Sequence, residues 1–554
     1  MSNRNIAGRL TAAAQAWPEE IAVVEPLGYG PRGKRRYRHL TFRELDEDSD
    51  RIARGLCGLG VEPGTRLALL VRPGIDFISL VFALFKAGAV AILIDPGMGR
   101  RNLIGCLAEA APQGFVAIPI VHAVRTLARS RFAAARLNVT VGRRWFWGGA
   151  TLDQLRAGPP PGPQLATTTA DDPAAIIFTT GSTGPPKGVL YTHGNFDAQV
   201  DEIRNFYRIK PGEVDLPGFP LFGLFNCAMG VTTVIPDMDP SRPANVDPRK
   251  ILEAIEDWNV TQTFGSPAIW NRVGRYCREH QIRLPTVGRV LSAGAPVPAH
   301  VLERMKASIR PEGDVHTPYG ATEALPVASI AAGEVLGETA ALTDDGAGVC
   351  VGRKFPGIEW KVVRIVDGPI RRLQEAEELP SGEIGELIVS GPVVTRCYVT
   401  RTEANELGKI ADGKQVWHRM ADTGYLDEES RFWFCGRVAH RVLTAEGPMY
   451  PVRCEAVFNR HPDVFRSALV GVGPRGQQRP VIVVEPVRGR LPRREAEREG
   501  FVDAIRRLGR SNPLTARIDD FLFHPAFPVD IRHNAKIFRE KLAEWATKQL
   551  TAKR

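Results

Sequence analysis

Hydrophobic residues in the N-terminal two thirds of the chain alternate between amphipathic segments and short, continuously apolar runs. Residues 41–59 start with the capping-box pair Thr41 and Glu44 and keep apolar side chains on one face, which predicts a helix ended by the following glycine. The expected buried positions of this helix are Phe42, Leu45, Ile52, Leu56 and Leu59. Apolar runs at 66–71 and 89–94 enclose the next helical segment, so the order is β-α-β.

The same order returns further along the chain. A helical stripe over 251–258 precedes strand-like runs at 260–264 and 289–292, and another helix is expected from about residue 298. This alternation predicts an α/β fold with mainly parallel sheets and helices on both faces. Ligands of such sheets bind beyond the carboxyl ends of the strands.

The pattern becomes β-rich from Gly382, where residues 382–389 alternate as an antiparallel strand does. Beyond residue 437 the remaining chain mixes short strands and helices. We therefore expect two domains. Residues 1–436 would form a large N-terminal domain of parallel α/β subdomains plus a β-rich subdomain, and residues 437–554 a small α+β domain.

Composition narrows the class of protein. The 554 residues are 44% apolar and 24% charged with a net charge of +10, as in ordinary globular proteins. No uncharged apolar stretch is long enough for a membrane span and the N-terminus lacks a signal-peptide core, which predicts a cytoplasmic protein. Eight singly placed cysteines argue against a disulfide framework or a zinc site. The arginines of 488–517 alternate with glutamates, which favours a solvated helix face over a patch for an anionic ligand, a membrane or a partner. No nucleic-acid partner is expected.

Residues 178–189, Phe-Thr-Thr-Gly-Ser-Thr-Gly-Pro-Pro-Lys-Gly-Val, lie between two strand-like runs. Such a loop offers backbone N–H groups, hydroxyl donors and one lysine to a polyphosphate. It is not a Walker A motif, because Lys187 follows a proline and precedes a glycine. A flexible linker is the alternative interpretation. Two further turns at expected strand ends, 293–296 and 319–323, favour a nucleotide site.

These motifs and their order resemble the adenylate-forming superfamily of acyl-CoA synthetases, luciferases and adenylation domains, over about residues 15–545. The resemblance implies ATP and Mg²⁺ as cofactors, and a small C-terminal domain that moves as a lid. It implies that Glu323 binds Mg²⁺, that Thr322 contacts phosphate and that Tyr319 stacks on adenine. The other nucleotide-binding residues it implies are Thr179, Thr180, Gly181, Ser182, Thr183, Gly184, Lys187, Gly294, Ala295, Gly320, Asp422 and Arg437.

Two motifs of the family are altered here. The family's Thr-Gly-Asp is Met-Ala-Asp at 420–422, and the fifteen-residue spacing from Asp422 to Arg437, as in relatives, fixes the frame in which both would hold the ribose. Near the C-terminus Asn-Ala-Lys replaces Ser-Gly-Lys. By resemblance Lys536 is the lysine that bridges the substrate carboxylate and the α-phosphate, so we expect it to be catalytic.

The segment after Arg437 departs from relatives that use coenzyme A. Ala439 occupies the hinge position, and Glu446 stands where a loop glycine would line the pantetheine tunnel. The whole chain most resembles the synthetases of bacterial long-chain olefin biosynthesis, which close a 2-alkyl-3-hydroxy acid to a β-lactone. The resemblance suggests a long-chain hydroxy acid as substrate and assembly with other olefin-pathway enzymes. A fatty acyl-CoA or acyl-AMP ligase and a non-catalytic nucleotide-binding protein are the alternative functions.

No base for lactone closure stands out in the sequence. His440 is a candidate, and His193 is expected to pack at a helix start.

Overall fold

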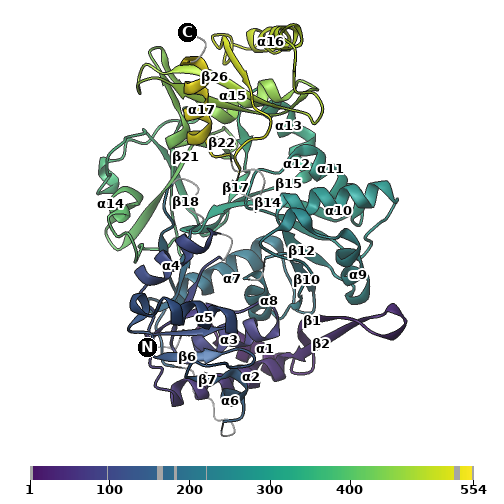
Figure 1. Ribbon diagram of the computed structural model, residues 1–554, viewed down its shortest axis with the longest axis vertical. Helices are drawn as coiled ribbons and strands as arrows, with labels where there is room; N and C mark the ends of the chain where they lie inside the picture. Colours follow the sequence, from purple (N-terminus) through teal and green to yellow (C-terminus); the bar gives the residue numbers. More distant parts are fainter. Residues whose placement is uncertain are drawn as a thin grey trace.

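The computed structural model (Figure 1) contains two large mainly parallel sheets, one antiparallel sheet and a small C-terminal unit. It describes residues 4–95, 98–158, 166–179, 184–219, 221–529 and 537–551. None of the helices in these ranges has the length and apolar run that a membrane crossing needs.

The first large sheet has nine strands. In spatial order they are β17 (Arg353–Lys354), β15 (Ala324–Ala331), β14 (Asp314–Ala321), β13 (Arg289–Ser292), β12 (Gln262–Gly265), β10 (Val214–Pro217), β11 (Thr232–Val234), β1 (Ile21–Tyr29) and β2 (Arg35–Thr41). Neighbours from β14 through β1 are parallel, and only the pairs at the two edges are antiparallel. The mainly parallel sheet expected from the sequence is confirmed.

The second large sheet has seven strands. They are β7 (Ala150–Thr151), β6 (Leu137–Thr140), β5 (Gly114–Ala117), β3 (Arg66–Leu70), β4 (Val90–Leu93), β8 (Pro173–Phe178) and β9 (Gly188–Thr192). All neighbours are parallel except β8 and β9, which form an antiparallel hairpin. The candidate phosphate loop is therefore the connection of this hairpin.

Helices cover these sheets. They are α1 (Gly8–Ala16), α2 (Phe42–Gly58), α3 (Ile75–Lys86), α4 (Arg100–Glu109), α5 (Pro119–Leu127), α6 (Leu152–Arg156), α7 (His193–Tyr207), α8 (Phe222–Met229), α9 (Pro248–Trp258), α10 (Pro267–Glu279) and α11 (Ala299–Ser308). Helix α3 packs on β4 of one sheet and β1 of the other, and all its residues except Asp76 are buried because nearly all of its surface is apolar. Its last residue, Lys86, is also buried and pairs with Asp46 and Asp50 of α2 at 2.6 Å each.

Helix α2 begins as its capping box predicts. Thr41 caps the backbone N–H of Glu44, and the Glu44 carboxylate accepts from the Thr41 N–H. The expected burial of Leu59 is wrong: it is the C-cap residue and is 38% exposed. The helical face turns away from the core at this point because Gly60, with φ of +93°, redirects the chain.

The third sheet is antiparallel. It contains β16 (Val349–Cys350), β22 (Phe432–Arg437), β21 (Gln415–Leu426), β19 (Gly385–Ser390) and β18 (Glu359–Val363), with β20 (Lys409–Asp412) paired to β21. The antiparallel region thus begins at residue 349 and not at Gly382. The sequence did not indicate β16 because it has only two residues, and it did not indicate β18 because its apolar and polar residues do not alternate. The helical segment α12 (Ala332–Glu334), a π-turn (Val335–Thr339) and α13 (Ala340–Asp344) precedes it, and α14 (Ala404–Gly408) lies within it.

The C-terminal segment builds its own small sheet and core. Its elements are β23 (Val442–Thr444), β24 (Gly447–Met449), α15 (Pro451–Asn459), β25 (Val464–Val472), β26 (Arg479–Pro486), α16 (Glu495–Arg510), β27 (Asp520–Phe523) and α17 (Arg539–Thr551). Two hydrophobic clusters within 442–546 contain no buried residue from outside this segment, and Figure 1 shows it above the ends of β21 and β22. Helix α16 buries only Ile505 and Gly509, which confirms the solvated helix expected for the arginine-rich run. The division at residues 436 and 437 stays a prediction.

Candidate active site

One cleft of about 2750 Å³ brings the sequence motifs together. It is bordered by the β8–β9 loop, the turn after β13, the β14–β15 hairpin, and strands β21 and β22. The expected site residues that line it are Thr179, Gly184, Lys187, Gly294, Ala295, Tyr319, Gly320, Thr322, Glu323, Asp422 and Arg437. The other five, Thr180, Gly181, Ser182, Thr183 and Lys536, lie outside the described residues.

A buried carboxylate joins two sides of the cleft. Asp422 on β21 pairs in register with Arg437 on β22, and Arg437 Nη1 donates to Asp422 Oδ1 at 2.6 Å. From the β14–β15 hairpin, the Tyr319 hydroxyl donates to Asp422 Oδ2 at 2.5 Å. The Asp422 charge raises the pKa of Arg437, while burial and the same charge raise the pKa of Tyr319, so one stays charged and the other neutral.

The backbone before Asp422 explains one departure from the family pattern. Ala421 has a φ of +54°, in the left-handed region that favours glycine, and the family motif has glycine at this position. The conformation is therefore kept although the residue has changed. The left-handed conformation of Ala421 interrupts the extended backbone of β21 just before Asp422. Asp422 itself still pairs with Arg437 of β22.

Glu323 is held from its backbone and its side chain. The Thr395 N–H and hydroxyl both donate to Glu323 O at 2.9 Å. The Tyr398 hydroxyl donates to Glu323 Oε1 at 2.7 Å. This carboxylate raises the pKa of Tyr398 further, beyond the effect of burial, so the phenol remains a donor.

Two lysines approach the Tyr398 ring. Lys187 Nζ lies 4.7 Å and Lys409 Nζ 5.6 Å from the ring centroid. Lys409 also donates to Thr395 O at 2.5 Å, which connects it to the residues that hold Glu323. Burial, with a smaller contribution from the Lys187 charge, lowers the pKa of Lys409 to about 8, although the Glu323 charge opposes the shift. Two lysines therefore lie on the same tyrosine that holds the Glu323 carboxylate.

The sequence analysis missed Thr395, Tyr398 and Lys409. None lies in the motifs that it used, and Thr395 and Tyr398 are 72 and 75 residues from Glu323. A tyrosine next to the antiparallel region carries no local signal for such a role. Only the packing of the third sheet against the β14–β15 hairpin makes these contacts.

An aromatic wall leads away from this charged region. Its rings follow one another as Tyr191, Phe196, Phe225, Phe222 and Phe264, with centroid separations of 5.0, 6.4, 5.7 and 3.5 Å. All five line the cleft. The Tyr191 hydroxyl donates to Thr322 O at 2.6 Å, so the apolar wall begins beside the charged residues. An acid with a long alkyl chain could place its carboxyl group at one end of this wall and its chain along it.

The two candidate histidines differ in position. His193 is fully buried at the start of α7 and accepts from the Ile6 N–H at 3.2 Å, which confirms its packing role. His440 lines the cleft and contacts Glu540 at 3.2 Å through Nε2. Burial lowers the pKa of His440 to about 4, so it is neutral at pH 7.

The segment that departs from coenzyme A-dependent relatives forms a short hairpin. Glu446 lies in the turn between β23 and β24 and pairs with Arg517 at 3.0 Å. Its neighbour Gly447 has a φ of +121°, and the Thr444 hydroxyl donates to Gly447 O at 2.8 Å. The turn is therefore closed by its own contacts.

The model of the AMP-binding enzyme family matches residues 10–399. This chain belongs to that family. It is 48% identical over 552 residues to the olefin beta-lactone synthetase of Xanthomonas campestris pv. campestris, covering 98% of each chain. It is 47% identical over 554 residues to the olefin beta-lactone synthetase of Stenotrophomonas maltophilia, covering 99% of this chain and 98% of the other.

Solved structures of this AMP-binding fold are similar at lower identity. ATP-bound MatB from Rhodopseudomonas palustris has a TM-score of 0.76 and 22% identity, and 99% of each chain is covered. The amide bond synthetase McbA from Marinactinospora thermotolerans has a TM-score of 0.77 and 22% identity, with 98% of this chain and 99% of that chain covered. The α/β fold expected from the sequence is thereby confirmed.

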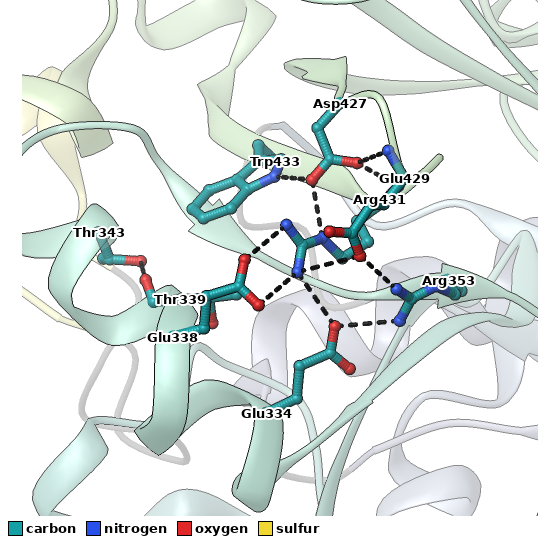
Figure 2. Close-up of polar contacts among 9 residues, drawn as sticks. All are labelled: Glu334, Glu338, Thr339, Thr343, Arg353, Asp427, Glu429, Arg431 and Trp433. Carbon is teal, nitrogen blue, oxygen red and sulfur yellow. Dashed lines mark hydrogen bonds and ion pairs between the residues drawn. The ribbon is translucent and has the colours of Figure 1, made fainter.

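A buried arginine supports the hairpin that carries Asp422 and Arg437. Figure 2 shows Arg431, at the turn between β21 and β22, among carboxylates from two segments. It pairs with Asp427 at 2.7 Å, with Glu338 at 2.9 Å and with Glu334 at 3.2 Å. The network joins the β21–β22 turn to α12 and the π-turn.

Removing this cation should destabilise the fold. Arg431 is only 6% exposed, so Arg431→Met would leave three carboxylates near one another without their shared partner. We expect a loss of about 3–5 kcal/mol in the free energy of unfolding. Urea unfolding followed by tryptophan fluorescence measures it.

The matched control is Arg353→Met. Arg353 pairs with Glu334 at 3.0 Å and with Glu429 at 2.7 Å but is 50% exposed, so we expect a loss below about 1 kcal/mol. Equal losses in the two variants would mean that the buried network does not determine the stability of this hairpin.

Proposed function

We propose that this chain is an ATP-dependent olefin β-lactone synthetase. It activates the carboxyl group of a long-chain 2-alkyl-3-hydroxy acid as an adenylate and closes it to a β-lactone. The observation that carries the proposal is the near-50% identity with two such synthetases over almost the whole of each chain. The charged cleft with an adjoining aromatic wall supports it, because the substrate has an anionic end and long alkyl chains.

The nucleotide would use the residues around Asp422. Each Asp422 oxygen already accepts one hydrogen bond and keeps lone pairs for a ribose hydroxyl. Arg437 keeps donors for the same sugar. Lys187 and Thr179, which line the cleft from the β8–β9 hairpin, would contact the polyphosphate.

The Mg²⁺ site would be built around Glu323. Within the described residues no cluster of three or more acidic, histidine or cysteine side chains could hold a metal by itself. One carboxylate together with phosphate oxygens suits Mg²⁺, which prefers oxygen ligands and few protein ones. When bound, the ion would neutralise charge on the phosphate oxygens. Tyr398 and Thr395 orient Glu323 for that contact.

Adenylation joins the substrate carboxylate to the α-phosphorus of ATP and breaks its bond to the β-phosphate, so pyrophosphate leaves. Lys536, outside the described residues, is the proposed cation for the developing charge. Ile537 and Phe538 follow it directly and line the cleft, which supports this placement.

In the second step the substrate's own hydroxyl oxygen bonds to the acyl carbon, and the bond from that carbon to AMP breaks. The hydroxyl proton must leave. We propose His440 as the acceptor because it lines the cleft and is neutral at pH 7, although its lowered pKa makes it a weak base. Because the nucleophile is tethered, no second substrate needs to enter. The residue Ala439 and the closed turn at Glu446 are consistent with a reaction that does not use coenzyme A.

The cytoplasmic location and an assembly with other olefin-pathway enzymes stay predictions.

Asp422→Asn should weaken ATP binding. The change removes the charge that accepts from the ribose and from Arg437 while keeping the side chain's shape. We expect the KM for ATP to rise about ten- to a hundredfold, since charge-assisted hydrogen bonds contribute about 1.5–3 kcal/mol. Pyrophosphate release at varied ATP concentration measures it.

The control is Asp427→Asn. Asp427 accepts from Arg431 Nε at 2.7 Å and from the Trp433 indole N–H at 2.8 Å, outside the cleft lining. This variant should lose stability and keep the KM for ATP. The reverse pattern would show that Asp427 is the ribose ligand.

Lys409→Met should raise the Mg²⁺ requirement. Without Lys409, Thr395 loses a partner and holds Glu323 less firmly, and changes behind a metal ligand typically cost about ten- to a hundredfold in metal affinity. A titration of activity against Mg²⁺ measures it, with the exposed Lys414→Met on the β20–β21 turn as control. An unchanged Mg²⁺ requirement in Lys409→Met would disprove the positioning role.

The reaction products distinguish a β-lactone synthetase from an acyl-CoA ligase. With a 2-alkyl-3-hydroxy long-chain acid, ATP and Mg²⁺, we expect AMP, pyrophosphate and a neutral β-lactone without coenzyme A. Mass spectrometry identifies the product. A simple fatty acid should be adenylated and stall, because it has no internal hydroxyl. If coenzyme A speeds AMP release and an acyl thioester accumulates, the chain is an acyl-CoA ligase.

A further inference from the structure

The outer face of α5 carries apolar side chains that no part of the described chain covers. Ile120, Val124 and Leu127 follow one another at helical spacing and are all exposed, Leu127 by 89%. Two aromatic residues that precede β7, Trp145 and Phe146, are exposed by 53% and 73%. Large exposed apolar patches of this kind mark an interaction site.

The two groups are connected through Trp147, which lies between the aromatic pair and the inner face of α5. Trp147 is buried and stacks on His122 of α5 with a ring separation of 5.6 Å. The rings of Trp145 and Phe146 lie 5.3 and 5.0 Å from Trp147. The Trp147 indole N–H donates to Thr140 Oγ1 on β6 at 2.9 Å, so the sheet fixes the aromatic residues beside the helix. We call Ile120, Val124, Leu127, Trp145 and Phe146 the α5 patch.

Positive charge surrounds the α5 patch. Residues 110–152 contain six arginines and no aspartate, glutamate or lysine, so this stretch carries +6 of the chain's net +10. Arg125 lies over the Phe115 ring at 6.0 Å. The other five are exposed and form no ion pair within the part of the chain that the structure describes: Arg129, Arg131, Arg136, Arg143 and Arg144.

The arginines adjoin both halves of the α5 patch. Arg129 and Arg131 lie in the 3-10 turn that follows α5 directly, and Arg143 and Arg144 immediately precede Trp145. Unpaired arginines beside exposed leucine, tryptophan and phenylalanine are the combination that binds an anionic bilayer surface: the rings and alkyl groups enter the interface, and the guanidinium groups contact phosphates. Three arginines in and beside α16, in contrast, pair with acids: Arg494 with Glu497, Arg506 with Asp503 and Arg510 with Asp519.

We propose that the α5 patch and its arginines dock this protein on the surface of an anionic phospholipid membrane. Ile118 and Val121, at the inner side of the same helix, line the catalytic cleft. Docking would therefore bring one wall of the cleft next to the bilayer. A substrate with long alkyl chains resides in such a bilayer, and this last step rests on the proposed function.

Vesicle co-sedimentation tests the proposal with the full chain. Vesicles of phosphatidylglycerol and phosphatidylcholine should bind the protein, and pure phosphatidylcholine vesicles should bind it far less. Binding should fall as salt rises, since the surface charge is screened. No binding to the anionic vesicles at low salt would overturn the proposal.

Two variants separate charge from apolar contact. The triple variant Arg129→Gln, Arg143→Gln, Arg144→Gln should lower the partition coefficient about a hundredfold, near fivefold for each arginine. Its control removes three exposed arginines elsewhere: Arg488→Gln, Arg493→Gln, Arg494→Gln. The double variant Leu127→Ser, Phe146→Ser should also lose binding, whereas Leu27→Ser, Leu491→Ser should retain it. Equal losses in variants and controls would mean that binding is unspecific.

Two further measurements test whether a second copy of the chain covers the α5 patch and whether docking affects turnover. Sedimentation velocity without lipid distinguishes a second copy: a dimer that the Leu127→Ser, Phe146→Ser variant dissociates, without vesicle binding, would make the patch a self-association interface and contradict the proposal. The same variant should keep turnover of acid dispersed in detergent and lose turnover of acid held in anionic vesicles. Vesicle binding itself needs no substrate, so its outcome is independent of the reaction assigned to the cleft.

Discussion

The carboxylate of Asp422 is the contact on which the cleft depends. It accepts one hydrogen bond from Tyr319, which belongs to the nine-stranded sheet, and another from Arg437, which belongs to the antiparallel sheet. A buried charge is tolerated only when such partners replace water. The same bonds therefore fix the two sheets against each other and leave lone pairs directed into the cleft. The left-handed backbone of Ala421 places the carboxylate there.

Two cations lie close together beside Glu323. Lys187 and Lys409 approach the same tyrosine ring, and Glu323 is the carboxylate whose charge opposes the lowered pKa of Lys409. Like charges held close together in a half-buried site cost free energy until an anion enters. A triphosphate and its metal ion would supply the missing charges. The preorganised donors would then stabilise charge that develops during attack at phosphorus without having to move.

Helix α5 relates this charged cleft to the protein's exterior. Its inner side borders the cleft and its outer side carries the exposed patch, so one short element faces both the substrate's site and the surroundings. The aromatic row from Tyr191 to Phe264 extends the apolar part of the cleft. Under the proposed docking, a long-chain acid would reach the cleft from the bilayer beside an apolar surface that arginines adjoin.

The sequence alone determined what local patterns encode. Periodicity and capping placed the helices and parallel strands. The spacing shared with the adenylate-forming family identified Asp422 and Arg437, and the β21–β22 hairpin does place these two residues opposite each other. Only the tertiary structure revealed that Thr395, Tyr398 and Lys409 converge on Glu323, and that Leu59 is exposed. These facts depend on how sheets pack across large separations in the chain. Hydrophobic periodicity and short motifs do not predict such packing, because it depends on surfaces that come into contact only after the helices and strands have formed.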